Sequence, residues 1–196
     1  MKLAFTTLGS PEWSFHKTLI EAEKLGFDAI EVRGMEGKML ADEITQFMPE
    51  NQAFTKASLK EHNIKICGFG TSVSFHEFDK YKAMIDEGKN AIDVCAKMEI
   101  PFIRVFGDRI ESDVIRDQVI ENVIRGIREL CSHAKGKNVK VLLEIHGDFN
   151  TTENVMDVVN EVKDYPEFGI LWDIEHSDRI YGNSYIGLYN EIKPFI

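Results

Sequence analysis

Six short apolar runs recur at regular intervals along the chain, and this regularity limits the folds that it can adopt. The runs begin near residues 2, 28, 63, 101, 139 and 169, so neighbouring starts lie about 26 to 38 residues apart. Most stretches between runs carry apolar residues at helical spacing, which is typical of repeated strand–helix units and a parallel sheet. The runs are apolar nearly throughout, as expected for strands that are covered on both faces. The sequence therefore predicts an α/β fold.

The expected strands cover residues 2–7, 28–33, 63–69, 101–106, 138–145 and 169–174. The expected helices cover residues 15–25, 50–61, 78–98, 113–135, 152–163 and 184–193. Ser14 is expected to cap the first helix and Gly26 to end it. Gly68, Gly70 and Ser72 are expected to form a loop after the third strand.

Two architectures fit this order: an open doubly wound sheet or a (β/α)8 TIM barrel. The chain has neither GxGxxG after the first strand nor GxxxxGK[ST], so the usual nucleotide-binding markers are absent. Polar residues at several strand ends favour the barrel, in which all these ends face one site. A barrel takes about 250 residues. We therefore expect residues 1–196 to form one partial barrel domain without the last two strand–helix units. Its open sheet edges would permit a homo-oligomer.

Composition narrows the range of partners and locations. The net charge is −10 and no long basic run occurs, which disfavours nucleic acid as a partner because its binding depends on clustered Lys and Arg. No apolar run approaches the length of a membrane span, and the N-terminus does not resemble a signal peptide. Cys67, Cys95 and Cys131 form no CxxC pair and are expected to be buried free thiols, which indicates a cytoplasmic protein.

Acidic side chains lie inside the last two apolar runs, VLLEIHGDF at 141–149 and GILWDIEH at 169–176. A carboxylate in an apolar strand is costly unless it is paired or binds a cation. Adjacent barrel strands would bring Glu144 and Asp173 close together, and a divalent cation would relieve their repulsion. The sequence therefore predicts a metal site, with a structural salt bridge or a helix cap as the alternative for each acid.

Other polar and aromatic residues near strand ends are candidates for substrate binding. His146 and His176 follow the two acids and could ligate a metal, bind a substrate hydroxyl or be satisfied structurally. Glu31 and Arg104 lie within the second and fourth strands, where each could face the barrel mouth or pair with another side chain. Trp13 could stack on a sugar ring or close the rim of the barrel.

The stretches LLEIHGDF and LWDIEH, together with KLGFDAIEVR and FIRVFGD, resemble the xylose-isomerase-like TIM-barrel superfamily. This group includes sugar isomerases and epimerases, hydroxypyruvate isomerase, inosose dehydratase and endonuclease IV. The resemblance implies that Glu144 and Asp173 ligate a metal, that His176 contacts substrate oxygens, and that Glu144 also acts in acid/base catalysis. In the isomerase and epimerase branch, a His on strand seven and a Glu on strand eight complete the metal shell.

The implied function is that of a metal-dependent sugar isomerase or epimerase using Mn, Mg, Co or Zn. Its substrate would be a small sugar or another hydroxy-carbonyl compound, and proton transfer next to the carbonyl would be the reaction. Two alternatives remain: a partial barrel that serves as a binding or assembly module without catalysis, and a DNA repair enzyme like endonuclease IV. The DNA repair alternative is disfavoured because strand four supplies no histidine and His76 is the one early candidate for a zinc cluster.

Overall fold

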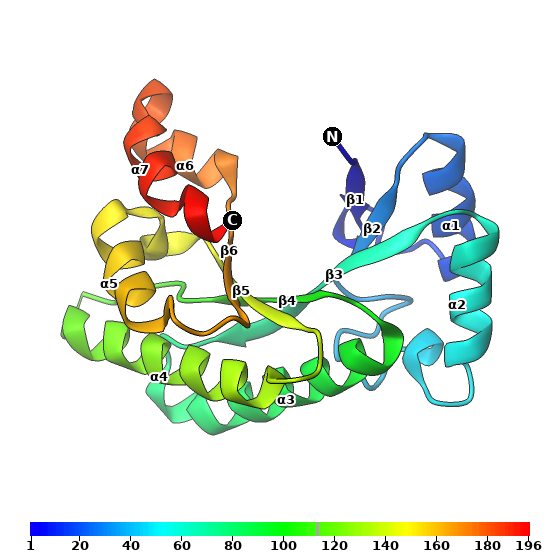
Figure 1. Ribbon diagram of the computed structural model, residues 1–196, viewed down its shortest axis with the longest axis horizontal. Helices are drawn as coiled ribbons and strands as arrows, with labels where there is room; N and C mark the ends of the chain where they lie inside the picture. Colours follow the sequence, from blue (N-terminus) through cyan, green and yellow to red (C-terminus); the bar gives the residue numbers. More distant parts are fainter. Residues whose placement is uncertain (113) are drawn as a thin grey trace. The chain divides into compact units, whose positions relative to one another are not determined.

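A computed structural model describes residues 1–112 and 114–196 and contains a six-stranded sheet in the order β1-β2-β3-β4-β5-β6 (Figure 1). Each strand lies beside its neighbour in the sequence, and the pairs β1–β2, β2–β3 and β5–β6 are parallel. This sequential order agrees with a TIM-barrel fold, since strand order reverses in a doubly wound sheet. The strands are β1 (Ala4–Thr6), β2 (Ala29–Val32), β3 (Lys65–Ser74), β4 (Phe102–Phe106), β5 (Lys140–Glu144) and β6 (Phe168–Leu171).

Helices follow the strands along the chain, as the sequence predicts. They are α1 (Phe15–Lys24), α2 (Gln52–Glu61), α3 (Tyr81–Met98), α4 (Arg116–Ala134), α5 (Thr152–Val162), α6 (Ile174–Tyr181) and α7 (Ile186–Ile192). Short 3-10 helices are η1 (Thr7–Gly9), η2 (Thr45–Phe47), η3 (Phe78–Lys80), η4 (Gly147–Asn150), η5 (Gly182–Ser184) and η6 (Lys193–Phe195). The predicted ends of α1 are confirmed: the Ser14 side chain accepts a hydrogen bond from the Lys17 N–H, and Gly26 has φ +77° just after the helix.

Three local predictions are wrong. Strand β3 does not stop before Gly70 but continues to Ser74, because this segment fully buries Thr71 and Val73. The predicted last strand does not reach Ile174; it ends at Leu171, and α6 begins at Ile174. The helix predicted from residue 113 begins at Arg116, and position 113 lies outside the described residues.

The chain divides into two compact units. The first comprises residues 1–71, 90–103 and 137–139, and the second comprises residues 72–89, 104–136 and 140–196. In the second unit, the buried side chains of β5 and α5 include Val141, Leu143, Val155, Val158, Val159 and Val162. The predicted partial barrel domain over the whole chain stays a prediction.

The cysteine prediction is confirmed for two of three residues. All three cysteines are free thiols; Cys95 and Cys131 are buried, whereas Cys67 is half-buried. Within the described residues, no helix combines the length and apolar character needed to cross a membrane.

Candidate functional site

Glu144 ends strand β5, where its side chain is only 13% exposed. Its place follows from the parallel pairing of β5 and β6, which sets Glu144 opposite Leu171. Asp173 follows Leu171 by two residues, so the two acids leave neighbouring strands at the same end of the sheet. This is the end at which active sites form in barrels of this kind.

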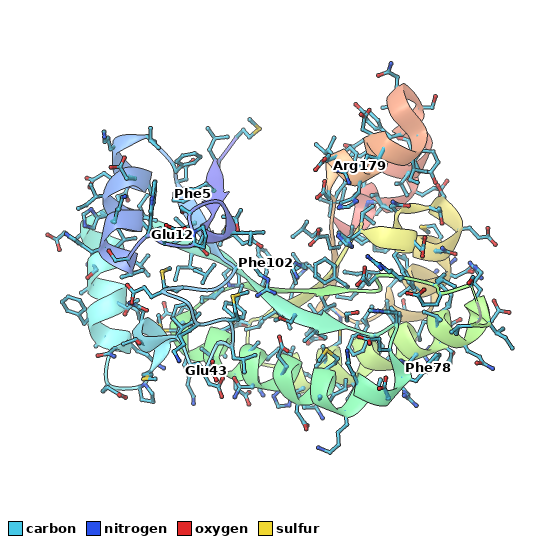
Figure 2. All side chains as sticks on the ribbon, turned by 180° about the vertical axis from the view of Figure 1, so that it is seen from behind. Phe5, Glu12, Glu43, Phe78, Phe102 and Arg179 are labelled. Atoms are coloured by element: carbon cyan, nitrogen blue, oxygen red, sulfur yellow. The ribbon has the colours of Figure 1, made fainter. Side chains whose placement is uncertain are left out.

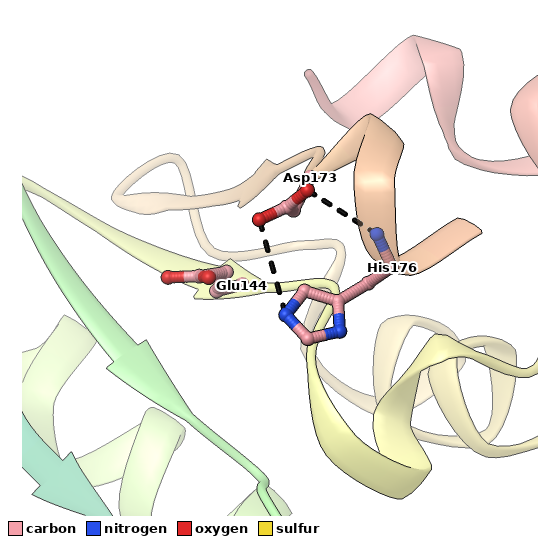
Figure 3. Close-up of side chains that lie close together, drawn as sticks. All are labelled: Glu144, Asp173 and His176. Atoms are coloured by element: carbon pink, nitrogen blue, oxygen red, sulfur yellow. Dashed lines mark hydrogen bonds and ion pairs between the residues drawn. The ribbon is translucent and has the colours of Figure 1, made fainter. Parts of the chain in front are cut away.

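Asp173 caps helix α6. Its Oδ1 accepts hydrogen bonds from the backbone N–H groups of Glu175 at 2.8 Å and His176 at 3.3 Å. Its other oxygen, Oδ2, lies 4.0 Å from Nε2 of His176. Figure 3 shows the two contacts between Asp173 and His176, with the Glu144 carboxylate on the adjoining strand. Asp173 therefore caps the helix with Oδ1, as the helix-cap alternative predicts, while Oδ2 faces the His176 ring.

Glu144, Asp173 and His176 form one candidate metal site. One ligand atom from each side chain lies within 4.8 Å of the others, and all three residues are half-buried. Carboxylate oxygens together with an imidazole nitrogen suit Zn, Mn and related divalent ions. The donor chemistry of these residues therefore fits the metal that the sequence predicts.

Arg104 pairs with Glu144. Its Nε lies 2.8 Å from Glu144 Oε2, and its guanidinium lies 4.0 Å from the centre of the Phe106 ring. The sequence predicts that Arg104 either faces the barrel mouth or pairs with another side chain, and that Glu144 either binds a metal or forms a salt bridge. The ion pair realises the pairing alternative for Arg104 and the salt-bridge alternative for Glu144. The guanidinium offsets part of the negative charge that the Glu144 and Asp173 carboxylates bring together.

His146 packs against the same cluster. Its ring centre lies 4.3 Å from that of His176 and 4.7 Å from that of Phe106. Burial, followed by the nearby His176, lowers the pKa of His146, while the charge of Asp108 opposes this shift. A lowered pKa favours the neutral ring, in which one nitrogen accepts hydrogen bonds.

Asp108 is a neighbour of the site that the sequence analysis missed. It follows strand β4 by two residues, and its Oδ1 lies 3.4 Å from Nδ1 of His146. Its Oδ2 lies 3.8 Å from Nδ1 of His76, in the loop after β3. The available signal was FIRVFGD, where an acid follows an apolar strand in the same manner as the two predicted ligands.

The two remaining candidates, Trp13 and Glu31, belong to the first unit. Trp13 is half-buried; its ring makes an edge contact at 6.3 Å with Phe5 (labelled in Figure 2), and Lys17 Nζ lies 4.7 Å from its centre. Glu31 is half-buried in β2, in register with Thr6 and Gly68 of the flanking strands. Their roles in substrate binding stay predictions.

Comparison with known sequences places the chain in a family. A family model described as "Xylose isomerase-like TIM barrel" matches residues 19–192. The chain is 26% identical over 190 residues to the inosose isomerase of Halalkalibacterium halodurans, covering 93% of this chain and 65% of that protein. It is 25% identical over 191 residues to the inosose isomerase of Bacillus subtilis, covering 93% of this chain and 66% of that protein. The chain thus spans about two thirds of the length of these curated relatives.

Solved structures share the fold. A probable 3-DHS dehydratase, AsbF, from Bacillus anthracis matches with a TM-score of 0.80 and 20% identity, over 100% of this chain and 71% of that one. D-psicose 3-epimerase from Clostridium cellulolyticum H10 matches with a TM-score of 0.79 and 18% identity, over 100% of this chain and 71% of that one. An IOLI protein with a zinc atom matches with a TM-score of 0.77 and 22% identity, over 97% of this chain and 68% of that one. These likenesses show the fold, and the family model over residues 19–192 shows that the chain belongs to the xylose isomerase-like TIM barrel family.

Proposed function

We propose that this chain carries the divalent-metal site of a sugar isomerase or epimerase, which moves a proton at a carbon next to a carbonyl group. The observation that carries this proposal is the convergence of Glu144, Asp173 and His176 within 4.8 Å of one another. Family membership supports the chemistry, because relatives and structural neighbours include inosose isomerases and a D-psicose 3-epimerase.

Glu144 and Asp173 would hold the metal through carboxylate oxygens. For Asp173 the donor would be Oδ2, since Oδ1 already accepts two backbone hydrogen bonds at the start of α6. Mn, Mg, Co and Zn are the candidate ions, and the zinc atom of the IOLI structure supports such a site in this fold. When bound, a divalent ion stabilises negative charge that develops on the substrate oxygens.

The chain's own side chains then position the substrate and move the proton. Glu144 takes the proton from the carbon next to the carbonyl, as a positioned carboxylate does in general acid–base catalysis. In an isomerisation this proton returns to the former carbonyl carbon, while the hydroxyl proton moves to the former carbonyl oxygen. In an epimerisation a second acid returns a proton to the same carbon from the opposite face. His176 and His146 bind substrate hydroxyls, and Arg104 fixes the direction of the Glu144 carboxylate through the ion pair at 2.8 Å.

The substrate class that we propose is a small sugar or a cyclic polyol ketone. The chain has no long basic run and a net charge of −10, so we propose no nucleic-acid substrate. We propose that Glu31 and Trp13 of the first unit contribute to substrate specificity.

The test is solvent exchange in D₂O. The chain, loaded with Mn²⁺ or Zn²⁺, is incubated with a panel of aldoses, ketoses and inososes, and NMR detects deuterium at the carbon next to the carbonyl. We expect exchange with the wild type and a loss of about 100-fold or more for Glu144→Gln, since removing a positioned base costs this much.

Glu129→Gln is the matched control for this exchange test. Glu129 is also a carboxylate paired with a cation, Lys89, but it lies on α4 away from the candidate ligands. We expect this variant to retain full exchange. Metal binding without exchange on any substrate of the panel would favour a binding module over an enzyme. Equal exchange by wild type and Glu144→Gln would refute the proposed role of this carboxylate.

A further inference from the structure

The carboxylate of Asp108 lies between two imidazoles from different loops. Its Oδ1 is 3.4 Å from Nδ1 of His146, and its Oδ2 is 3.8 Å from Nδ1 of His76. Nδ1 of His146 is buried, and within the described part of the chain no atom forms a hydrogen bond of standard geometry with it. A separation of 3.4 Å is somewhat long, as hydrogen bonds at catalytic sites often are before a ligand binds.

The backbone of Asp108 adopts a strained conformation. Its φ of +69° lies in the left-handed region, where residues other than glycine are uncommon. Its carbonyl oxygen accepts a hydrogen bond of 2.7 Å from the Asp148 N–H, and the Asp148 carboxylate accepts one of 2.7 Å from the Ile110 N–H. These bonds tie the loop after β4 to the loop after β5. Strain of this kind persists where the surroundings enforce it, and it concentrates at functional sites.

Close packing between the two loops leaves Asp108 little freedom. Gly147, with φ +58°, follows His146 directly, and a Cβ at this position would lie 2.3 Å from the Asp108 carbonyl oxygen. Only glycine therefore permits this approach of the two backbones. The same loop carries His146, whose ring contacts His176 at 4.3 Å, so the position of Asp108 is linked to the candidate metal site.

We propose that Asp108 is a positioning residue for His146. Its carboxylate accepts the Nδ1–H of the neutral ring, which fixes the ring orientation and leaves Nε2 as the hydrogen-bond acceptor for a substrate hydroxyl. In a histidine, the partner of one ring nitrogen decides which nitrogen carries the hydrogen. The substrate part of this proposal rests on the proposed isomerase or epimerase function, whereas the effect on the ring does not.

The first test determines which ring nitrogen of His146 carries the hydrogen. Two-dimensional ¹⁵N NMR of the chain at about pH 8, assigned with a His146→Gln variant, shows which nitrogen carries the hydrogen. We expect hydrogen on Nδ1 in the wild type. Asp108→Asn removes the carboxylate but suits the left-handed backbone, since Asn also tolerates this region. Its amide can donate to Nδ1, so we expect hydrogen on Nε2 in this variant.

The second test uses the exchange reaction on metal-loaded protein. We expect Asp108→Asn to lower kcat for exchange by about tenfold to 100-fold, since misplacement of a positioning group can cost this much. Its affinity for the metal should stay within about twofold of the wild type, since Asp108 is not among the proposed ligands. Glu77→Gln is the control: it removes an exposed carboxylate 3.9 Å from Nε2 of His76, and it should change neither the NMR pattern nor the exchange.

The outcomes separate the two proposals. Hydrogen on Nε2 in the wild type, or the same pattern in wild type and Asp108→Asn, would overturn the positioning role. A residue that only braces the loops would lower the melting temperature of the variant and leave the ring pattern unchanged, which also overturns the proposal. The expected NMR change without any exchange by the wild type would reject the isomerase or epimerase function and leave the positioning of His146 standing.

Discussion

The Nε atom of Arg104 lies 2.8 Å from Oε2 of Glu144, and the two side chains are only 10% and 13% exposed. The fourth and fifth strands therefore bring opposite charges together at the edge of the candidate metal site. Burying two charges is costly, and their attraction repays this cost only while both partners are present. This pair links the stability of the chain to the same carboxylate that we propose as a metal ligand.

Removing the arginine should expose this link. We predict that Arg104→Met lowers the free energy of unfolding by about 3 kcal/mol, because it leaves the buried Glu144 carboxylate without its guanidinium. Mn²⁺ or Zn²⁺ should restore part of the loss, since the ion supplies the missing positive charge. Urea unfolding with and without metal measures both effects.

The double variant Arg104→Met/Glu144→Gln is the control for this prediction. It removes both charges, so we expect a smaller loss of stability than in the single variant and no rescue by metal. An equal loss with and without metal in Arg104→Met would show that no ion compensates Glu144.

Two helical glycines should respond oppositely to alanine. A Cβ on Gly126 in α4 would lie 2.5 Å from the Phe75 ring, which is fully buried. We predict that Gly126→Ala destabilises the chain by about 1–3 kcal/mol, the usual cost of overpacking. Gly187 in α7 has no atom within 4 Å of such a Cβ, so Gly187→Ala should be neutral or stabilise by up to about 1 kcal/mol. Thermal unfolding distinguishes the two variants. Equal changes in melting temperature for Gly126→Ala and Gly187→Ala would contradict the close contact with Phe75.

The cysteines should differ in reactivity. Burial raises the pKa of Cys131 to about 12, with the charge of Glu167 adding to the shift, and burial also raises the pKa of Cys95. Because the thiolate is the reactive form, we predict that neither thiol reacts with a disulfide reagent in the native chain at about pH 8. Cys67, which is half-buried, should react first. Loss of this first phase in Cys67→Ser would confirm the assignment, and fast reaction of two or more thiols would contradict it.

The same shifts predict how stability depends on pH. The thiols of Cys95 and Cys131 keep their protons in the folded chain well above the ordinary pKa of 9.0. The unfolded chain loses these protons as the pH rises through 9.0, so it binds fewer protons than the folded chain. Their contribution to stability is therefore fully present below pH 9.0 and decreases above it. Urea unfolding between about pH 8 and 10.5 should show a smaller decrease in Cys131→Ala than in the wild type.

The sequence predicted the strand–helix order because each strand is a distinct apolar run and most helices carry clear helical spacing. It failed where local signals conflict. Ile174 prolongs the apolar pattern of the last strand, but Asp173 caps a helix there, and tertiary packing settles the choice. Gly70 suggests a loop, yet burial of Thr71 and Val73 extends strand β3 through it.

The sequence predicted those residues of the candidate site that follow from local pattern, but not those that depend on tertiary packing. The positions of Glu144, Asp173 and their histidines at strand ends follow from local pattern and the parallel sheet. The pairing of Arg104 with Glu144 depends on how two strands lie beside each other, which composition and spacing do not specify. Asp108 was missed because its position beside His146 depends on a left-handed backbone held by contacts from another loop.

The central claim is that Glu144 and Asp173, beside His176, bind a divalent ion, and calorimetric titration of Mn²⁺ or Zn²⁺ into the chain and into Asp173→Asn tests it most directly. Asn caps helices as well as Asp does, so the metal-free variant should unfold at the temperature of the wild type. We predict one bound ion per wild-type chain and an affinity at least about tenfold lower for Asp173→Asn, since ligand charge sets the affinity of such sites. Equal affinities, or no binding by the wild type, would contradict the claim.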